Sequence, residues 1–139
     1  MRKNDPINHI MASDVESVQD GQALSDIYKL MCNTGVHHVP VLKGKQLAGL
    51  VSFTDMMKLD LAIHGIDVHT IDKVMDAQFT IGDVMSSSLV TLGENQTVRD
   101  VADKLSEGDF HSLPVVNDGN ELVGIVTSTD LIRYLSEQY

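Results

Sequence analysis

An internal repeat is the feature that most constrains the fold of this chain of 139 residues. Residues 10–42 align with residues 84–116, and residues 43–59 align with residues 118–134. Identical residues recur at equivalent places, among them Met11/Met85, His37/His111, Pro40/Pro114, Gly49/Gly124, Thr54/Thr129 and Asp55/Asp130. A unit of about 50 residues buries too little surface to be stable alone, so the two copies are expected to fold as a pair.

Each copy contains the same order of predicted elements. They are a short strand (15–18 and 89–92), a helix (from 24 and from 98), a hairpin (36–42 with 47–51, and 110–116 with 122–126) and a second helix. Thr54 and Thr129 stand at the expected N-caps of the second helices. The sequence therefore predicts an α/β (α+β) fold of two β-α-β-β-α repeats, packed through their sheets about a pseudo-twofold axis.

The repeat also predicts the domain boundaries. The first domain is expected at 1–61 and the second at 84–139, with a linker at 62–83. The linker is too apolar for a free tether, since it contains Ile63, Ile66, Val68, Ile71, Val74 and Met75. Part of it is expected to be helical and docked, although Gly65 argues against one unbroken helix.

Composition narrows the classes of partner. The 20 acidic residues outnumber the 10 Lys and Arg, giving a net charge of -10 that repels nucleic acid and anionic membranes. No window approaches the roughly 20 apolar residues of a membrane helix, and no signal peptide is evident, which predicts a cytoplasmic protein. The single cysteine, Cys32, cannot form an internal disulfide and is expected to be buried and inert.

A second repeated pattern contains polar residues that could form a binding site. Segments 49–55 and 124–130 each contain glycine, two apolar residues, a hydroxyl residue, any residue, threonine and aspartate. Such a segment predicts a strand that runs into a helix N-terminus, where N–H and hydroxyl donors suit a phosphate. The aspartate that follows can accept two hydrogen bonds from a ribose diol. One copy alone would be explained by helix capping, but the recurrence of the triplet favours a nucleotide site.

Together these motifs resemble the cystathionine-beta-synthase (CBS) domain, here as the tandem pair called a Bateman module. The resemblance covers residues 10–59 and 84–137. Each half has a lead-in with methionine (Ile10-Met11 and Val84-Met85), a His-x-x-Pro-Val segment (37–41 and 111–115) and the closing glycine-to-aspartate motif.

The resemblance implies a stand-alone regulatory protein whose clefts bind adenine nucleotides or S-adenosylmethionine. It implies that Asp55 and Asp130 hold the ribose, that Ser52, Thr54, Thr127 and Thr129 approach the phosphate, and that Ser13, Asp14, Val15, Ser87, Ser88 and Leu89 flank the adenine. His37, His38, His111, Pro40 and Pro114 belong to the segment that reaches the phosphates in some members. His38 and Ser112 stand where some members have arginine, so few cations are present. This favours AMP or ADP, with ATP and S-adenosylmethionine as alternatives, and Phe53 could narrow the first cleft.

The sequence argues against a metal site and an enzyme, and leaves a ligand-free interaction module open. No Cys/His spacing of the zinc type is present, and His64 and His69, five residues apart, do not share a helical face, so no metal site is expected. An enzyme would need a base, and the only repeated candidates, His37 and His111, are expected in buried strands, so neither activity nor a cofactor is predicted. A ligand-free pair serving for dimerisation or protein interaction stays open. A homodimer through helix faces is expected, with output to a separate effector protein that the sequence does not name.

Overall fold

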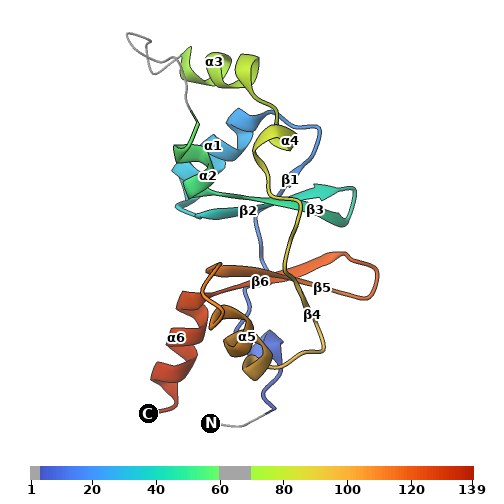
Figure 1. The fold of residues 1–139 in the computed structure, drawn as a ribbon, viewed down its shortest axis with the longest axis vertical. Helices are drawn as coiled ribbons and strands as arrows, with labels where there is room; N and C mark the ends of the chain where they lie inside the picture. The colour runs from blue at the N-terminus through green and yellow to red at the C-terminus, as the bar shows by residue number, and fades with distance from the viewer. Residues whose placement is uncertain (1–3, 60–69) are drawn as a thin grey trace. The chain divides into compact units, whose positions relative to one another are not determined.

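The computed structural model of the chain describes residues 4–59 and 70–139 (Figure 1). Two compact units make up the fold, and they do not coincide with the two sequence copies. The first-copy unit contains Glu16–Gly44 and Ala48–Leu89, and the second-copy unit contains Met1–Val15, Lys45–Leu47 and Val90–Tyr139. Each unit therefore takes part of its chain from outside its own copy.

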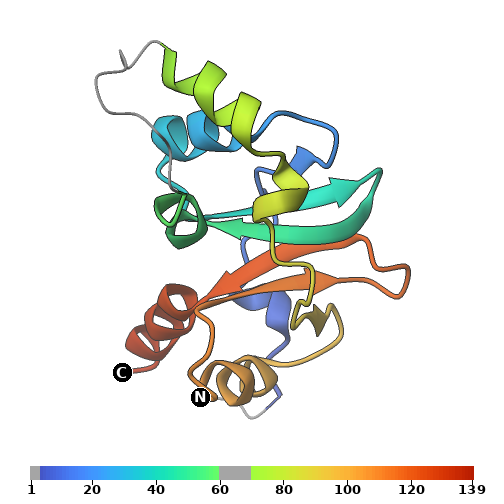
Figure 2. The same cartoon turned by 45° about the horizontal axis from the view of Figure 1, so that its top comes forward.

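The first-copy unit is built on the three-stranded sheet β1-β2-β3. Its elements are β1 (Val18–Gln19), α1 (Leu24–Thr34), β2 (His38–Lys43), β3 (Gln46–Ser52), α2 (Phe53–Met57), α3 (Ile71–Gln78) and α4 (Ile81–Val84). β1 is parallel to β2, with Val18 opposite Val41. The helices lie on one face of this sheet, where their apolar sides enclose a core centred on Leu24, Ile27 and Val41 (Figure 2).

The second-copy unit is built on the sheet β4-β5-β6. Its elements are the 3-10 turn η1 (Ile7–His9), β4 (Leu92–Gly93), α5 (Val98–Leu105), β5 (Ser112–Val116), β6 (Leu122–Thr127) and α6 (Ser128–Glu137). β4 is parallel to β5 and β5 is antiparallel to β6, with a bulge between Val115 and Val116. The core contains Leu92, Val101, Leu113, Val115 and Val126 together with Ile7.

The β-α-β-β-α order of each copy is confirmed. The first strand of each copy is wrongly placed by the sequence, because regular pairing occurs only at Val18–Gln19 and Leu92–Gly93, at the end of each apolar stretch. The residues before these strands instead continue the lead-in segments. Packing of the two sheets about a pseudo-twofold axis stays a prediction.

The lead-in segments extend the repeat three residues toward the N-terminus of each copy. Ile7 stands in the same place relative to Met11 as Ile81 does relative to Met85. Both isoleucines are fully buried, but each in the unit of the other copy: Ile7 with the second-copy core and Ile81 with the first-copy core. Backbone hydrogen bonds fix the first lead-in to the second-copy unit. The N–H of Ile7 donates to the carbonyl of Gln96 (3.0 Å), and the N–H of Val98 donates to the carbonyl of Asp5 (2.8 Å).

The described part of the linker contains α3 and α4. Met75 of α3 is buried in the first-copy core. The Asp76 carboxylate accepts hydrogen bonds from both the backbone N–H (2.9 Å) and the hydroxyl (2.6 Å) of Ser25, at the first turn of α1. Lys29 and Asp72 add an exposed ion pair (3.4 Å) between the same helices. Ile63, His64, Gly65, Ile66, Val68 and His69 lie outside the described residues.

Replacing Asp76 by alanine is expected to lower the free energy of unfolding by about 1–3 kcal/mol, because the buried Ser25 hydroxyl would lose its partner. The change should also raise protease sensitivity near α3. Asp72→Ala, which removes only the exposed pair, should cost less than about 1 kcal/mol and serves as the control. Urea unfolding measures both variants, and equal losses would show that the Asp76–Ser25 contact is not the anchor.

The Cys32 expectation is wrong: its side chain is exposed. The residue lies on α1 directly after buried Met31, so the 3.6-residue period of the helix turns Cys32 away from the core. Apolar composition in a helical pattern therefore did not decide which neighbour faces inward.

Candidate functional site

The two glycine-to-aspartate motifs run from strand to helix as predicted, but their N-caps are not the predicted ones. Thr54 and Thr129 lie inside the first turns of α2 and α6, with exposed side chains. The caps are Ser52 and Thr127, whose hydroxyl oxygens accept from the backbone N–H groups of Asp55 (3.0 Å) and Asp130 (3.2 Å). The sequence rule failed because each motif offers more than one hydroxyl residue, and extended backbone ends at the first one.

Each motif aspartate also has a structural role. Oδ2 of Asp55 accepts from the Ser52 N–H (2.8 Å), and Oδ2 of Asp130 accepts from the Thr127 N–H (2.9 Å), which completes a capping box. Asp100, at the start of α5, makes the same bond to Thr97 (2.9 Å). An aspartate three residues after a cap thus also occurs at a helix start outside the two motifs. In both motifs this leaves Oδ1 as the oxygen that a ligand can approach.

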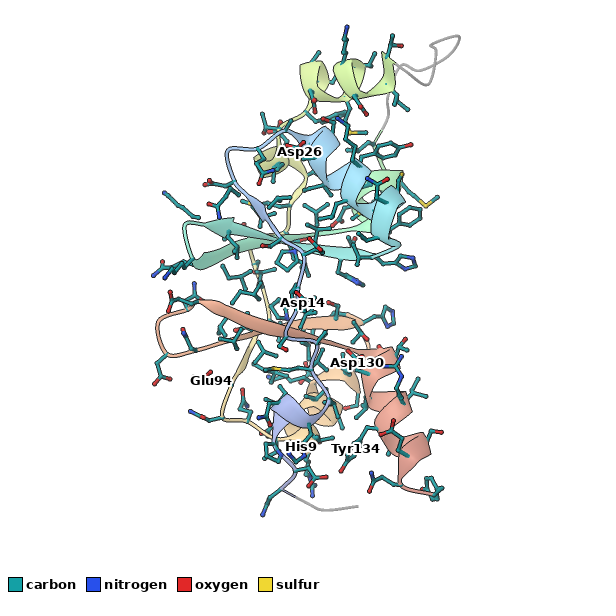
Figure 3. The ribbon with its side chains drawn as sticks, turned by 180° about the vertical axis from the view of Figure 1, so that it is seen from behind. His9, Asp14, Asp26, Glu94, Asp130 and Tyr134 are labelled. Carbon is teal, nitrogen blue, oxygen red and sulfur yellow. The ribbon has the colours of Figure 1, made fainter. Side chains whose placement is uncertain are left out.

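The surroundings of Oδ1 are described best for Asp130, at the first turn of α6 (Figure 3). Its side chain is only 17% exposed. Nη1 of Arg133, one turn further along, lies 3.4 Å from Oδ1, but the arginine side chain is 64% exposed. The pair is therefore weak and well hydrated, so a ligand hydroxyl can replace the guanidinium at this oxygen.

The histidine segments meet the motifs through backbone bonds. The His37 carbonyl accepts from the N–H of Phe53 (2.7 Å), and the His111 carbonyl accepts from the N–H (2.9 Å) and hydroxyl (3.2 Å) of Ser128. The rings of His37 and Phe53 also stack, with centroids 5.5 Å apart. Both histidines are exposed, so the expectation of buried strand histidines is wrong. Regular strand begins one residue later, at His38 and at Ser112. His37 therefore lies directly before β2 and beside the start of α2, and His111 lies directly before β5 and beside the start of α6.

The lead-in residues of each copy, like Ile7 and Ile81, belong to the compact unit of the other copy. Ala12 pairs with Ile125 of β6, so Ser13, Asp14 and Val15 belong to the unit that contains Asp130. Ser86 pairs with Leu50 of β3, so Ser87, Ser88 and Leu89 belong to the unit that contains Asp55. The serines and Asp14 are exposed, while Val15 and Leu89 are half-buried. Each unit thus combines the motif of one copy with the lead-in of the other.

The remaining candidate residues divide by burial. His38 begins β2 and is half-buried. Pro40 and Pro114 are buried in the middle strands β2 and β5, where they contribute to packing.

Sequence reasoning did not include Ser112 among the candidate site residues. This residue follows His111 and lies opposite Thr127 across β5 and β6. It is 6% exposed, and its hydroxyl has no hydrogen-bond partner among the described residues. A buried hydroxyl without a partner costs free energy, which a polar ligand group could recover. Its signal in the sequence was the exchange of His38 for serine at the equivalent position of the second copy.

The pKa values of Asp83 and Tyr28 are shifted from their ordinary values. Hydrogen bonds from the backbone and then the side chain of Thr80, the N-cap of α4, lower the pKa of Asp83, which completes the capping box. A hydrogen bond with Cys32 raises the pKa of Tyr28. Neither group belongs to a motif, so the perturbations report capping and packing. In the described parts of the chain, no three His, Cys, Asp or Glu side chains gather as a metal site would require, and no helix has the length and apolarity to cross a membrane.

The chain is similar to known proteins in sequence and in fold. The family model for the CBS domain matches residues 7–62 and 81–137, the same N-terminal limits that the buried Ile7 and Ile81 indicate. Protein MJ1225 of Methanocaldococcus jannaschii is 24% identical over 96% of this chain and 48% of its own length. The chain spans about half or less of the length of the first curated relatives that it matches.

Two solved structures have the same fold over their full length. CBSX2 in complex with AMP has a TM-score of 0.79 at 24% identity, and covers 96% of this chain and 97% of CBSX2. The CBS domain pair of MJ0100, in complex with 5'-methylthioadenosine and S-adenosyl-L-methionine, has a TM-score of 0.78 at 22% identity. The alignment covers 98% of this chain and 99% of the MJ0100 pair.

Proposed function

The chain belongs to the CBS domain family, and from this premise we propose that it is a regulatory module that binds an AMP- or ADP-type nucleotide and signals to a separate protein. Both solved neighbours were crystallised with adenosine-containing molecules. The observation that carries the proposal in this chain is the assembly of Asp130, Thr129 and His111 with the lead-in 13–15 in one compact unit.

The second-copy unit is the better of the two candidate sites. Its motif helix α6 has 10 residues, whereas α2 has five, so the N-terminal partial charge is better developed. Ser128 replaces the bulkier Phe53 at the first helical position. The unpartnered Ser112 hydroxyl lies in this unit and not in the other. These three differences favour occupation of the second-copy unit first.

The roles proposed for the residues follow from the atoms left available. Oδ1 of Asp130 accepts from the ribose diol, because Oδ2 is held by the Thr127 N–H. Thr129 has an exposed side chain and offers its hydroxyl to the phosphate. Val15 supplies an apolar contact and Ser13 and Asp14 supply backbone groups for the adenine. Arg133, whose guanidinium lies 3.4 Å from Asp130, supplies one cation beside the site, which suits one or two phosphates better than three.

Regulation is proposed to act through linkage. A nucleotide that binds one arrangement of the protein more tightly shifts the population toward it, and a partner with different affinities for the arrangements reads the shift. Turnover of the nucleotide is not part of the proposal, because neither motif pairs a nucleophile with a base. A homodimer formed through helix faces is proposed as the assembly, and the effector is a separate protein.

Thermal unfolding with AMP, ADP, ATP and S-adenosylmethionine, each at millimolar concentration, tests the ligand class. At about 100 times its dissociation constant a ligand adds about 2.7 kcal/mol, which raises the midpoint by several degrees in a protein of this size. AMP or ADP is expected to give the largest shift. A larger shift with S-adenosylmethionine would support the second candidate, which the MJ0100 complex favours. No shift with any compound would support a ligand-free interaction module.

Asp130→Asn is expected to weaken nucleotide binding about tenfold or more, since the amide retains one acceptor for the cap but loses the charged oxygen that faces the ribose. Asp100→Asn is the matched control, because Asp100 has the same capping-box bond and lies in the same unit. Calorimetric titration measures both variants. Equal effects on binding would assign Asp130 a capping role alone.

A further inference from the structure

Residues 5–15 form a strap that belongs to the second-copy unit and is bonded to it near both of its ends. At one end the carboxylate of Asp5 accepts a hydrogen bond from the Tyr134 hydroxyl of α6. Near the other end, Ala12 and Ile125 of β6 exchange two backbone hydrogen bonds of 2.9 Å. We propose that this N-terminal strap transmits nucleotide binding in the second-copy unit to the partner protein, with α6 and the Tyr134–Asp5 bond as the connection. The proposal rests on the nucleotide function proposed above.

The strap and the proposed nucleotide site share residues. The last three residues of the strap, 13–15, are the proposed adenine contacts and follow Ala12 directly. The proposed ribose contact, Asp130, lies at the first turn of α6. A nucleotide that contacts both links the strap to α6, as the Tyr134–Asp5 bond already does. Two links between the same elements stabilise each other, so nucleotide binding should tighten the strap, and a docked strap should favour binding.

Helix α6 places the two links next to each other. Asp130 and Tyr134 are four residues apart, so their side chains lie on the same face of the helix, one turn apart (Figure 3). Tyr134 is only 7% exposed, and its hydroxyl donates to the half-buried Asp5. A hydrogen bond weakens steeply as its length and angle depart from the optimum. A small displacement of α6 by a ligand at Asp130 therefore changes the strength of the Tyr134–Asp5 bond.

The first copy has apolar side chains at the equivalent places. By the alignment of the copies, Phe79 stands in the place of Asp5, and Leu59 stands in the place of Tyr134. Both side chains are half-buried and pack against the first-copy core. The fold thus accepts apolar contacts here, and these tolerate sliding because apolar burial is not directional. The bond that depends on geometry occurs in the unit that is the better candidate nucleotide site, as an element that responds to binding requires.

Hydrogen exchange of the full chain, with and without AMP, tests the strap. The N–H of Ile7 donates to the carbonyl of Gln96 (3.0 Å) and reports the N-terminal end of the strap, while the N–H of Ala12 reports the other end. AMP at about 100 times its dissociation constant is expected to slow exchange about tenfold or more at both amides, because opening of the strap competes with binding. The N–H of Ser86, which makes the equivalent bond in the first-copy lead-in (2.9 Å to the carbonyl of Leu50), is the internal control and should change less than about twofold.

Tyr134→Phe separates the two links, because it removes the hydroxyl and retains the ring. In this variant AMP should slow exchange at Ile7 by less than about twofold, whereas the effect at Ala12 should remain because the lead-in still contacts the nucleotide. Asp5→Ala should behave in the same way, and Asp5→Asn, which retains an acceptor oxygen, should restore the effect at Ile7. Tyr28→Phe removes a tyrosine hydroxyl from the first-copy unit and is the control variant, which should match the wild type.

Three outcomes would overturn the proposal. They are AMP binding that does not slow exchange at Ile7, equal slowing at Ile7 and Ser86, and an effect at Ile7 that persists unchanged in Tyr134→Phe. Calorimetric titration of the wild type with AMP distinguishes this failure from failure of the proposed function. Absence of AMP binding would overturn the nucleotide function and the strap proposal together, whereas AMP binding without an effect on the strap would overturn the strap proposal alone.

Discussion

Ile7→Ala is expected to lower the free energy of unfolding by about 2–5 kcal/mol, the range for deleting a large aliphatic side chain in a core. Ile7 is fully buried in the second-copy core although it lies at the N-terminal end of the chain, before the first copy. The alanine leaves a cavity in the core that also contains Leu92, Leu113 and Val115.

Urea unfolding measures this loss, with Asn8→Ala as the control. Asn8 lies in the same turn but is exposed, so its change should stay within about 0.5 kcal/mol. Ile81→Ala provides a second, matched variant, because Ile81 is fully buried in the first-copy core at the equivalent place. Losses below about 1 kcal/mol in both isoleucine variants would mean that the lead-ins are not part of the cores.

Gly124→Ala is expected to cost about 1–3 kcal/mol through overpacking. A Cβ at this position would lie 2.7 Å from Sδ of Met11 and 2.9 Å from the carbonyl oxygen of Ala12. The same relation recurs at Gly49, where a Cβ would lie 2.5 Å from Sδ of Met85 and 3.0 Å from the Ser86 carbonyl oxygen. The methionine of one copy therefore requires the glycine of the other.

A double-mutant cycle separates the side-chain clash from the backbone clash. Met11→Ala removes the sulfur but leaves the Ala12 carbonyl, so the double variant with Gly124→Ala should recover only part of the single loss. Gly93→Ala is the control in the same unit, since its Cβ would meet nothing nearer than 3.7 Å and its backbone has no positive φ. If Gly124→Ala is as well tolerated as Gly93→Ala, the methionine–glycine contact does not restrict this position.

These contacts give a structural reason for several residues that are identical in the two copies. Met11, Met85, Gly49 and Gly124 are identical between copies because they pack against each other across the exchange of lead-ins. The motif aspartates recur partly because a capping box needs a carboxylate three residues after the cap. A residue that recurs in both copies can therefore be required by the fold alone. The ligand hypothesis depends on the aspartate oxygen atoms that the capping bonds leave available.

Local patterns in the sequence determined the elements and their order. Helical spacing predicted α1 and α5, and the apolar runs beside glycine-containing joints predicted the hairpins, because these signals depend on neighbours within one element. The repeat predicted two equivalent units, and the charge excluded classes of partner. The placement of the N-caps was wrong by two residues, since each motif offers more than one hydroxyl group and only the backbone conformation selects one.

The tertiary structure alone decided which parts of the chain share a core. No local pattern shows that Ile7 packs with Val115, or that Ala12 pairs with Ile125, because these residues are more than 100 positions apart. It also decided that Cys32 is exposed and that the Ser112 hydroxyl is buried with no hydrogen-bond partner among the described residues. Burial and hydrogen-bond satisfaction depend on all the elements that meet at a point, whereas periodicity reports only the element in which a residue lies.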